Sequence, residues 1–254
     1  MNTKIPNSEL EIYKRISNDF KVVFDVGCRT DIDYYHINTT PTYHLFEPNT
    51  SFTKELKEKI SKLSNHNIIV NEVGLSDINK DDCTYYSNVQ SFTPHWQVVS
   101  VHELGDRFPL RRLDDYVTDN NVEHIDFLKI DVEGLDYNVL SGGSDTFKNK
   151  TSFIQFECSG DVKKYVTMLD ESFDLYMMVE PALFDCLQQY NFDVDFNTSL
   201  IKLDDKMIDF MDNTLGTRIN MPGNATMGSG CGYNIFCINK SIKYDINDLI
   251  FNII

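Results

Sequence analysis

Basic residues are scarce in this 254-residue chain: 23 Lys and Arg stand against 39 Asp and Glu, for a net charge of −16. A protein that binds DNA or RNA through the phosphate backbone needs a basic surface. The charge balance therefore argues against nucleic acid as the main partner. It says little about small or neutral substrates.

The chain also lacks disulfide, zinc and membrane signals. Its six cysteines show no CxxC and no zinc-ligand spacing, which favours free thiols in a reducing compartment. No apolar run approaches the length that spans a membrane, and the N-terminus MNTKIPNSELEIYKR has no apolar core of a signal peptide. We therefore expect a cytoplasmic protein without a membrane partner.

The length suits one well-buried α/β domain over residues 1–254. Within it we expect an N-terminal helix in 1–20, a Rossmann-like core over 21–180, an insertion or lid over 182–231 and a final strand at 233–239. No linker separates a second domain.

Short apolar runs rich in β-branched residues alternate with amphipathic segments, which predicts a doubly wound, mostly parallel sheet with helices on both faces. The long connection before the last strand leaves room for an antiparallel final strand. Residues 81–110 are expected to be irregular, with edge strands around 98–101. The expected strands are 21–26, 41–46, 67–73, 125–130, 152–157, 173–179 and 233–239, and the expected helices are 8–20, 51–63, 113–119, 135–143 and 161–169.

The segment HIDFLKIDVEGLDYNVLSGG, residues 124–143, reads as a strand, an acidic turn and a helix. Ligands of open α/β sheets bind outside the carboxyl ends of the strands. Six successive strands are expected to end in or next to a carboxylate, so this edge of the sheet is predicted to be acidic. The six are Asp25, Glu47, Asp77, Asp131, Glu157 and Glu180.

The first two of these acids suggest a nucleoside site. Gly27, after Asp25, allows a close approach of backbone and ligand. Glu47 follows at the end of the next strand, about 20 residues later, where an acid accepts hydrogen bonds from ribose hydroxyls. The turn GCRTD at 27–31 lacks the GxGxxG pattern and carries Asp31, which disfavours a pyrophosphate. A cationic nucleoside without phosphate, such as S-adenosylmethionine (SAM), fits better.

At this point the chain resembles the FkbM family of SAM-dependent methyltransferases. The resemblance implies a Rossmann-like class I methyltransferase fold with seven strands, the last antiparallel. It also implies methylation of a hydroxyl, typically of a sugar in a glycan or a glycosylated metabolite. The motifs that carry it are VVFDVGCRTD (22–31), YHLFEPN (43–49), VGLSD (73–77), RRLDDYV (111–117), IDFLKIDVEG (125–134) and VLSGG (139–143).

The resemblance also implies a set of cofactor contacts. One departure stands out, because the family usually has glycine where this chain has Asp31. Asp31 would weaken cofactor binding, or cap the following helix while the loop takes another course. A catalytically degenerate binding protein therefore stays an alternative. The implied cofactor-binding residues are Asp25, Gly27, Cys28, Arg29, Asp31, Glu47, Pro48 and Asn49, with Ser76, Asp77 and Asp131 near the adenine, methionine or substrate end.

Methyl transfer to a hydroxyl requires in-line positioning and is helped by a general base or a metal. Asp131 and Glu133 are the first candidates for the base, and Glu157 is the third. Lys129 lies on the same side of a regular strand as Asp131, with a catalytic or a salt-bridging role. His95 lies in the irregular segment and is the last candidate.

Two further alternatives remain open. Clustered carboxylates bind divalent cations, so a Mg²⁺ ion at Asp131 and Glu157 is one of them. The other is methylation of an RNA ribose 2′-hydroxyl, which uses a Lys-Asp-Lys-Glu set on the same fold, although the net charge counts against it. That set would be Lys14 or Lys21, Asp131, Lys163 or Lys164, and Glu180.

Overall fold

A computed structural model of the chain describes residues 8–64, 67–85, 106–132, 134–158, 160–179, 184–194, 200–215, 219–220, 226–227 and 233–244. The chain divides into two compact units, residues 20–151 on one side and residues 1–19 with 152–254 on the other. The single domain over 1–254 stays a prediction.

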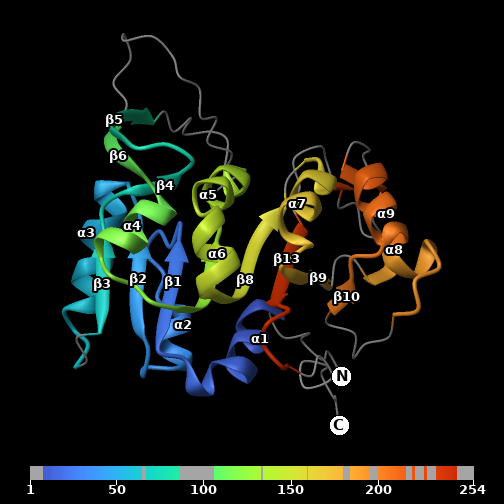
Figure 1. Cartoon of the computed structure of the whole chain (residues 1–254), viewed down its shortest axis with the longest axis horizontal. Coiled ribbons are helices and arrows are strands. Elements are labelled where there is room, and N and C mark those ends of the chain that lie inside the picture. The colour runs from blue at the N-terminus through green and yellow to red at the C-terminus, as the bar shows by residue number, and fades with distance from the viewer. Residues whose placement is uncertain are drawn as a thin grey trace. The chain divides into compact units, whose positions relative to one another are not determined.

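Four parallel strands form the main sheet of the unit over 20–151, in the order β3 (Ile68–Asn71), β2 (Thr42–Phe46), β1 (Val22–Val26) and β7 (Ile125–Ile130). Figure 1 shows the first three of them side by side. The sequence VVFDV of β1 is almost continuously apolar, because this strand is covered on both faces. Val23 and Phe24 are fully buried. The alternation of strands and helices thus gives the expected parallel core.

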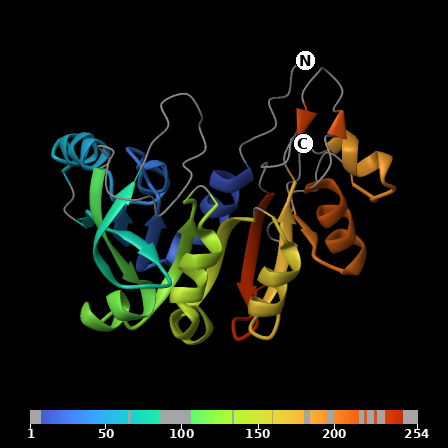
Figure 2. The ribbon, with the colours of Figure 1, turned by 90° about the horizontal axis from the view of Figure 1, so that it is seen from above.

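Helices cover both faces of this sheet. Figure 2 shows α2 (Asp33–Ile37) and α3 (Thr50–Ile60) on one face, and α4 (Leu113–Asp119), α5 (Asp136–Gly142) and α6 (Ser144–Lys150) on the other. The Asn49 side chain caps α3 by accepting the N–H groups of Ser51 and Phe52 at 2.9 and 3.3 Å. The helix expected over 135–143 is α5, and α6, which follows it, is a further helix that was not expected.

A small sheet of three strands lies in the same unit, in the order β4 (Gly74–Ser76), β6 (Asp106–Arg112) and β5 (Lys80–Tyr85). β4 is parallel to β6, and β5 is antiparallel to it. The expected third strand therefore ends at Asn71 rather than at residue 73, and the next residues join this second sheet. A strand of three residues has no periodicity that a sequence could reveal. The edge strand expected around 98–101 lies outside the described residues.

The other unit has a row of four strands in the order β8 (Thr151–Cys158), β13 (Tyr233–Asn239), β9 (Phe173–Met178) and β10 (Leu200–Lys202). β13 is antiparallel to both β8 and β9, which confirms the antiparallel final strand. β10 is one strand more than the seven expected, in the stretch predicted as an insertion. The other elements of this unit are α1 (Ser8–Ile16), a 3₁₀ turn (Ser17–Asp19), α7 (Val162–Leu169), α8 (Phe184–Gln189), α9 (Asp205–Leu215), β11 (Ile219–Asn220) and β12 (Thr226–Met227).

These elements confirm an α/β, Rossmann-like fold. The helices within the described ranges are all too short or too polar to cross a membrane. Five cysteines in the described parts of the chain are free thiols, as expected, and Cys231 lies outside those parts.

Candidate active site

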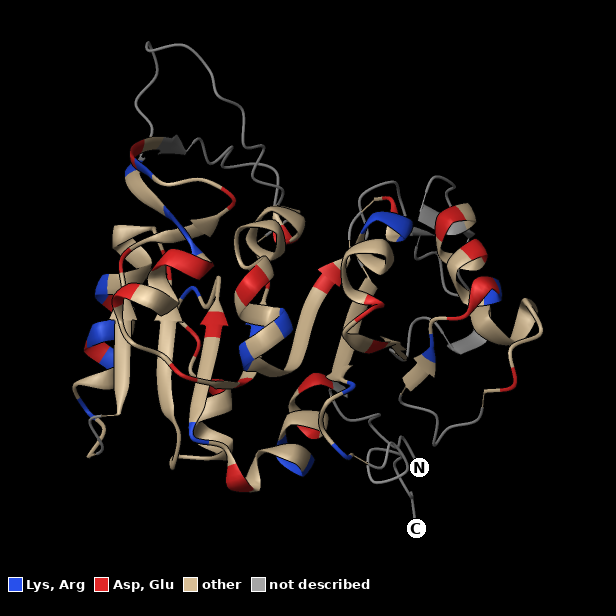
Figure 3. Ribbon diagram, viewed as in Figure 1, with Lys and Arg blue, Asp and Glu red and all other residues tan. Residues whose placement is uncertain are grey.

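The carboxyl ends of β1, β2 and β7 meet at one edge of the parallel sheet. The register pairs Asp25 with Leu45 on one side and with Lys129 on the other. The ladder continues past the strand ends, where Gly27 N–H donates to Phe46 O at 2.9 Å and Asp131 N–H donates to Val26 O at 2.9 Å. Figure 3 shows acidic ribbon, in red, near the arrowhead of β1 and along α4.

Gly27 lies directly against the backbone that follows β7. Its φ is +83°, and a Cβ added there would lie 1.9 Å from Asp131 O. An L-residue is strained at this φ and would also collide with a carbonyl oxygen. Glycine at this position is therefore what lets the loop after β1 touch Asp131.

Four N–H groups of this loop are bonded within the protein. Gly27 and Cys28 both donate to Phe46 O, at 2.9 and 3.4 Å, and Asp31 donates to Cys28 O at 2.9 Å. Arg29, with φ +52°, donates its N–H to Glu47 Oε2 at 3.0 Å. A phosphate site needs N–H groups that point at the ligand. The geometry agrees with the missing GxGxxG pattern.

Glu47 joins the loops that follow β1 and β2. Its side chain is buried, and its two oxygens accept the N–H groups of Arg29 at 3.0 Å and of Asn49 at 2.7 Å. Burial raises the pKa of Glu47, while these two hydrogen bonds and the Arg29 charge lower it. Each carboxylate oxygen has a second lone pair, so both still have capacity to accept a hydroxyl proton. Pro48 and Asn49 lie in the turn that leads into α3.

Lys129 bridges two of the predicted site carboxylates. Its Nζ lies 3.6 Å from Asp25 Oδ1 and 3.3 Å from Asp131 Oδ2. The Asp25 side chain is 5% exposed and that of Asp131 is 47% exposed, so one acid is internal and the other faces solvent. Burial raises the pKa of Asp25, and Lys129 opposes this shift. Asp25 Oδ1 accepts no hydrogen bond from the described residues.

Cys28 and Asp31 complete the loop after β1. Burial, followed by the charges of Asp25 and Glu47, raises the pKa of the Cys28 thiol well above its usual value, so Cys28 stays protonated. Asp31 is exposed, and its charge also raises the pKa of Asp25. The suggestion that Asp31 caps the next helix is wrong, because α2 begins after Ile32 and has no side-chain cap.

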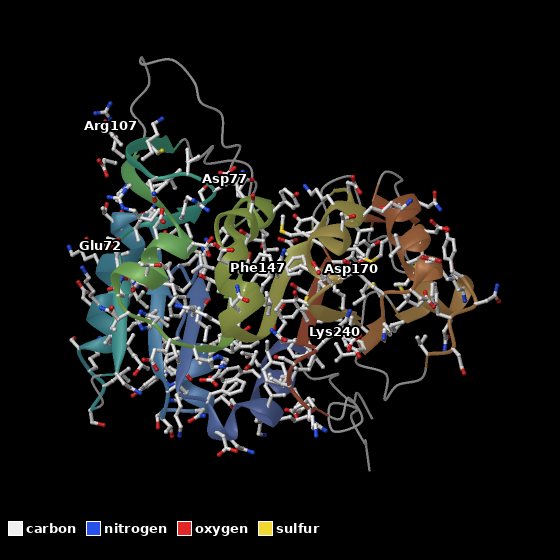
Figure 4. All side chains as sticks on the ribbon, in the orientation of Figure 1. Glu72, Asp77, Arg107, Phe147, Asp170 and Lys240 are labelled. Atoms are coloured by element: carbon white, nitrogen blue, oxygen red, sulfur yellow. The ribbon has the colours of Figure 1, made fainter. Side chains whose placement is uncertain are left out.

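Ser76 and Asp77 form a turn held between α5 and α4. Ser76 Oγ lies 3.1 Å from Asp77 Oδ1, and a Cβ on Gly142 would lie 1.9 Å from Ser76 O. Asn79 Oδ1 accepts the Arg112 N–H at 2.9 Å, and the Asn79 amide donates to Asp115. Asp77, labelled in Figure 4, is exposed. It follows β4 of the small sheet rather than a strand of the main sheet, which corrects the expected placement.

Helix α4 was expected over 113–119, but its contacts with the site were missed by sequence reasoning. Asp114 accepts the N–H groups of Thr146 at 2.8 Å and of Asp145 at 3.4 Å, so it caps α6 from a neighbouring helix. Tyr116 bonds to β2 and β3 through His44 and Asn71. The motif RRLDDYV carries part of the family resemblance and begins the expected helix, but no local pattern in it indicates these contacts. Its contacts show that α4 connects the scaffold elements of the site.

Other predicted site residues lie in the other unit or outside the described part of the chain. Glu157 lies in β8 of the other unit, and Glu133 and His95 lie outside the described residues. Lys163, one member of the alternative RNA-methylating set, pairs with Asp212 at 3.1 Å on the other unit. The described part of the chain contains no group of three or more His, Cys, Asp or Glu that could hold a metal ion, which leaves the Mg²⁺ site without support.

Comparison with known proteins identifies the family of this chain. The family model of the methyltransferase FkbM domain matches residues 27–194, which is most of the chain. The chain belongs to the FkbM methyltransferase family. This FkbM chain is therefore a methyltransferase of a SAM-dependent family, with the Rossmann-like class I methyltransferase fold.

This FkbM chain is similar in sequence to one methyltransferase and in structure to several others. It is 27% identical over 176 residues to 2-O-methyltransferase NoeI of Sinorhizobium fredii, covering 61% of this chain and 71% of NoeI. It is similar to the methyltransferase FkbM structure from Methylobacillus flagellatus, with 13% identity, a TM-score of 0.46 and coverage of 65% of this chain and 44% of that one. The chain thus spans less than half of that protein. SMU.1697c of Streptococcus mutans, in complex with SAH, matches with 9% identity, a TM-score of 0.48 and coverage of 94% and 99%.

Proposed function

We propose that this FkbM chain transfers a methyl group from SAM to a hydroxyl of a sugar, in a glycan or in a glycosylated metabolite. The observation that carries the proposal is the acidic edge where Asp25, Glu47 and Asp131 meet around Gly27. The N–H groups of Gly27, Cys28, Arg29 and Asp31 in its loop are bonded internally, which suits a cationic nucleoside better than a phosphate. The similarity to a 2-O-methyltransferase supports a hydroxyl as the acceptor.

The residues at this acidic edge fit the positively charged cofactor SAM. Glu47 would accept the ribose hydroxyls, since both of its oxygens retain lone pairs. Asp131 and the buried Asp25 place negative charge near the site, and Lys129 neutralises part of it. When bound, SAM supplies an electrophilic methyl group on a positively charged sulfur. The charge of Asp31 adds to the same acidic edge.

Asp131 is the candidate base. It is half exposed at the end of β7, and Lys129 holds its Oδ2 at 3.3 Å, which fixes the direction of the carboxylate. During transfer the acceptor oxygen forms its bond to the methyl carbon while the bond from sulfur to that carbon breaks. The hydroxyl proton then passes to the Asp131 carboxylate. Alignment of the hydroxyl with the methyl group supplies most of the acceleration.

Calorimetric titration with SAM tests the cofactor site. We expect Glu47→Ala to raise the Kd for SAM by about tenfold or more, because charge-assisted hydrogen bonds to the ribose are lost. Glu72→Ala is the matched control, since Glu72 is exposed, lies next to the same strand ends and pairs with Lys57. Equal affinities of Glu47→Ala and the wild type would remove Glu47 from the ribose. Absence of binding to the wild type at millimolar SAM would identify a degenerate binding protein.

Transfer of a labelled methyl group tests the acceptor and the base. We expect label in a panel of mono- and oligosaccharides but not in capped RNA. Label in RNA alone would instead favour ribose 2′-O-methylation. Asp131→Asn, which keeps the side-chain shape, should reduce turnover at least about 100-fold, the typical contribution of a general base. The exposed Asp119→Asn serves as control, and a fully active Asp131→Asn variant would exclude Asp131 as the base. Turnover that survives a chelator would exclude an essential metal.

A further inference from the structure

We propose that Tyr116 is a positioning residue for Glu47 and that it acts through Asn71. The proposal rests on the proposed function, because Glu47 affects affinity only if the cofactor binds beside it. Tyr116 lies on α4, far from Glu47 in the sequence. The Tyr116 hydroxyl bonds to the side chain of Asn71, and the backbone carbonyl of Asn71 accepts the N–H of Glu47.

The hydroxyl of Tyr116 has two partners, Asn71 Oδ1 at 3.0 Å and His44 Nδ1 at 2.8 Å. It has one proton to donate, and Asn71 Oδ1 is an acceptor only, so that proton goes to Asn71. His44 Nδ1 must then carry a hydrogen and donate to Tyr116. Burial lowers the pKa of His44 to about 4, so the ring is neutral near pH 7 and this tautomer is fixed.

Asn71 carries the effect from the Tyr116 hydroxyl to Glu47. Its side-chain N–H donates to Leu45 O at 3.2 Å, which directs Oδ1 toward Tyr116. Its backbone carbonyl accepts the Glu47 N–H at 3.0 Å. Within the described residues β3 pairs only with β2, so its end has no second strand to hold it. The bond from Tyr116 therefore anchors the end of β3 to which Glu47 is attached.

The ring of Tyr116 is held independently of its hydroxyl. It packs edge-on against Phe46, with centroids 4.7 Å apart, and against Phe24 at 5.8 Å. These contacts involve the aromatic ring alone. Tyr116→Phe preserves them and removes only the oxygen, which makes it a clean test of the hydrogen bond.

We expect Tyr116→Phe to raise the Kd for SAM by about three- to tenfold, the effect of losing one buried hydrogen bond. The change should appear in KM for SAM rather than in kcat, because Tyr116 does not contact the reacting atoms. Tyr43→Phe is the matched control. Tyr43 is buried in β2, the strand that leads into Glu47, but its hydroxyl bonds to Asn38 O at 2.6 Å, at the end of β2 away from Glu47. Tyr43→Phe should lower thermal stability about as much as Tyr116→Phe does, and should leave the Kd for SAM unchanged.

A double-mutant cycle decides whether Tyr116 acts through Glu47. In the Glu47→Ala background, Tyr116→Phe should change the Kd by less than about twofold, because the effects of coupled residues are not additive. Equal losses with and without Glu47, or an unchanged Kd in the single variant, would overturn the proposal. Hydrogen exchange of the Glu47 amide without cofactor supplies a second readout. It should become faster in Tyr116→Phe only, and an unchanged rate would also overturn the proposal. If the wild type binds no SAM, the proposed function fails on its own, and this exchange rate still tests the anchoring.

Discussion

Replacing Gly27 by alanine should destabilise the protein more than the same change at Gly160, a second glycine with a positive φ. Two costs add at this position. The φ of +83° is unfavourable for an L-residue by about 1–2 kcal/mol. The new Cβ would also lie 1.9 Å from Asp131 O, where contacts closer than 3.0 Å are essentially never seen.

Relief of this contact requires the loop after β1 and the end of β7 to separate by about 1 Å. That movement stretches the bond from Asp131 N–H to Val26 O, which is 2.9 Å long. Overpacking of this kind costs about 1–3 kcal/mol. The total loss in the free energy of unfolding is therefore about 2–5 kcal/mol. Asp131 moves with its backbone, so turnover should fall as well.

Urea unfolding followed by circular dichroism measures the loss, and Gly160→Ala provides the matched control. Gly160 has a φ of +84°, but a Cβ there would meet no atom within 4 Å. Gly160→Ala should therefore lose only the conformational part, about 1–2 kcal/mol. The difference between the two variants isolates the contact between Gly27 and Asp131. Equal losses in the two variants would refute the close approach, and with it the geometry of the acidic edge.

Two other predictions concern the scaffold around the site. The pKa of His44 falls from 6.5 to about 4 on folding, so the neutral ring contributes stability above pH 6.5 that is lost as the pH falls toward 4. The free energy of unfolding should decrease by about 3 kcal/mol over this window relative to His44→Asn, as measured by urea unfolding at several pH values. Asp114→Ala should lower the free energy of unfolding by about 0.5–2 kcal/mol, because α6 loses its cap.

Both of these predictions have clear contrary outcomes. A constant difference between the wild type and His44→Asn from pH 7 to pH 4 would show that His44 does not titrate as a buried neutral ring. The exposed Asp119 on the same helix is the control for Asp114. If Asp119→Ala and Asp114→Ala unfold at the same urea concentration, the capping of α6 contributes nothing to stability.

Much of the central fold could be predicted from local sequence. The runs around Phe24, Leu45 and Leu128 predicted β1, β2 and β7, because a buried parallel strand needs a short apolar segment and neighbours on both sides. The antiparallel β13 was also expected, from the long connection that precedes it. In contrast, β4 and β10 have three residues each, too few for a pattern. They form because a partner strand is already in place.

The candidate site divides in the same way. The sequence alone placed Asp25, Gly27, Glu47 and Asp131 at the ends of parallel strands, because such ends share one edge of a sheet. It could also exclude a phosphate-binding glycine pattern. These properties depend on residues close together in the chain, so local patterns are sufficient to indicate them.

Only the tertiary structure decided which side chains meet at that edge. The bridge of Lys129 between Asp25 and Asp131 depends on strand register, and the contact of Tyr116 with Asn71 depends on how α4 packs on the sheet. The same packing shows that Asp77 follows a strand of the small sheet. Contacts between residues far apart in the sequence follow from register and packing, which no local periodicity encodes. The sequence therefore determined the strands and the acids at their ends, and the folded chain determined their partners.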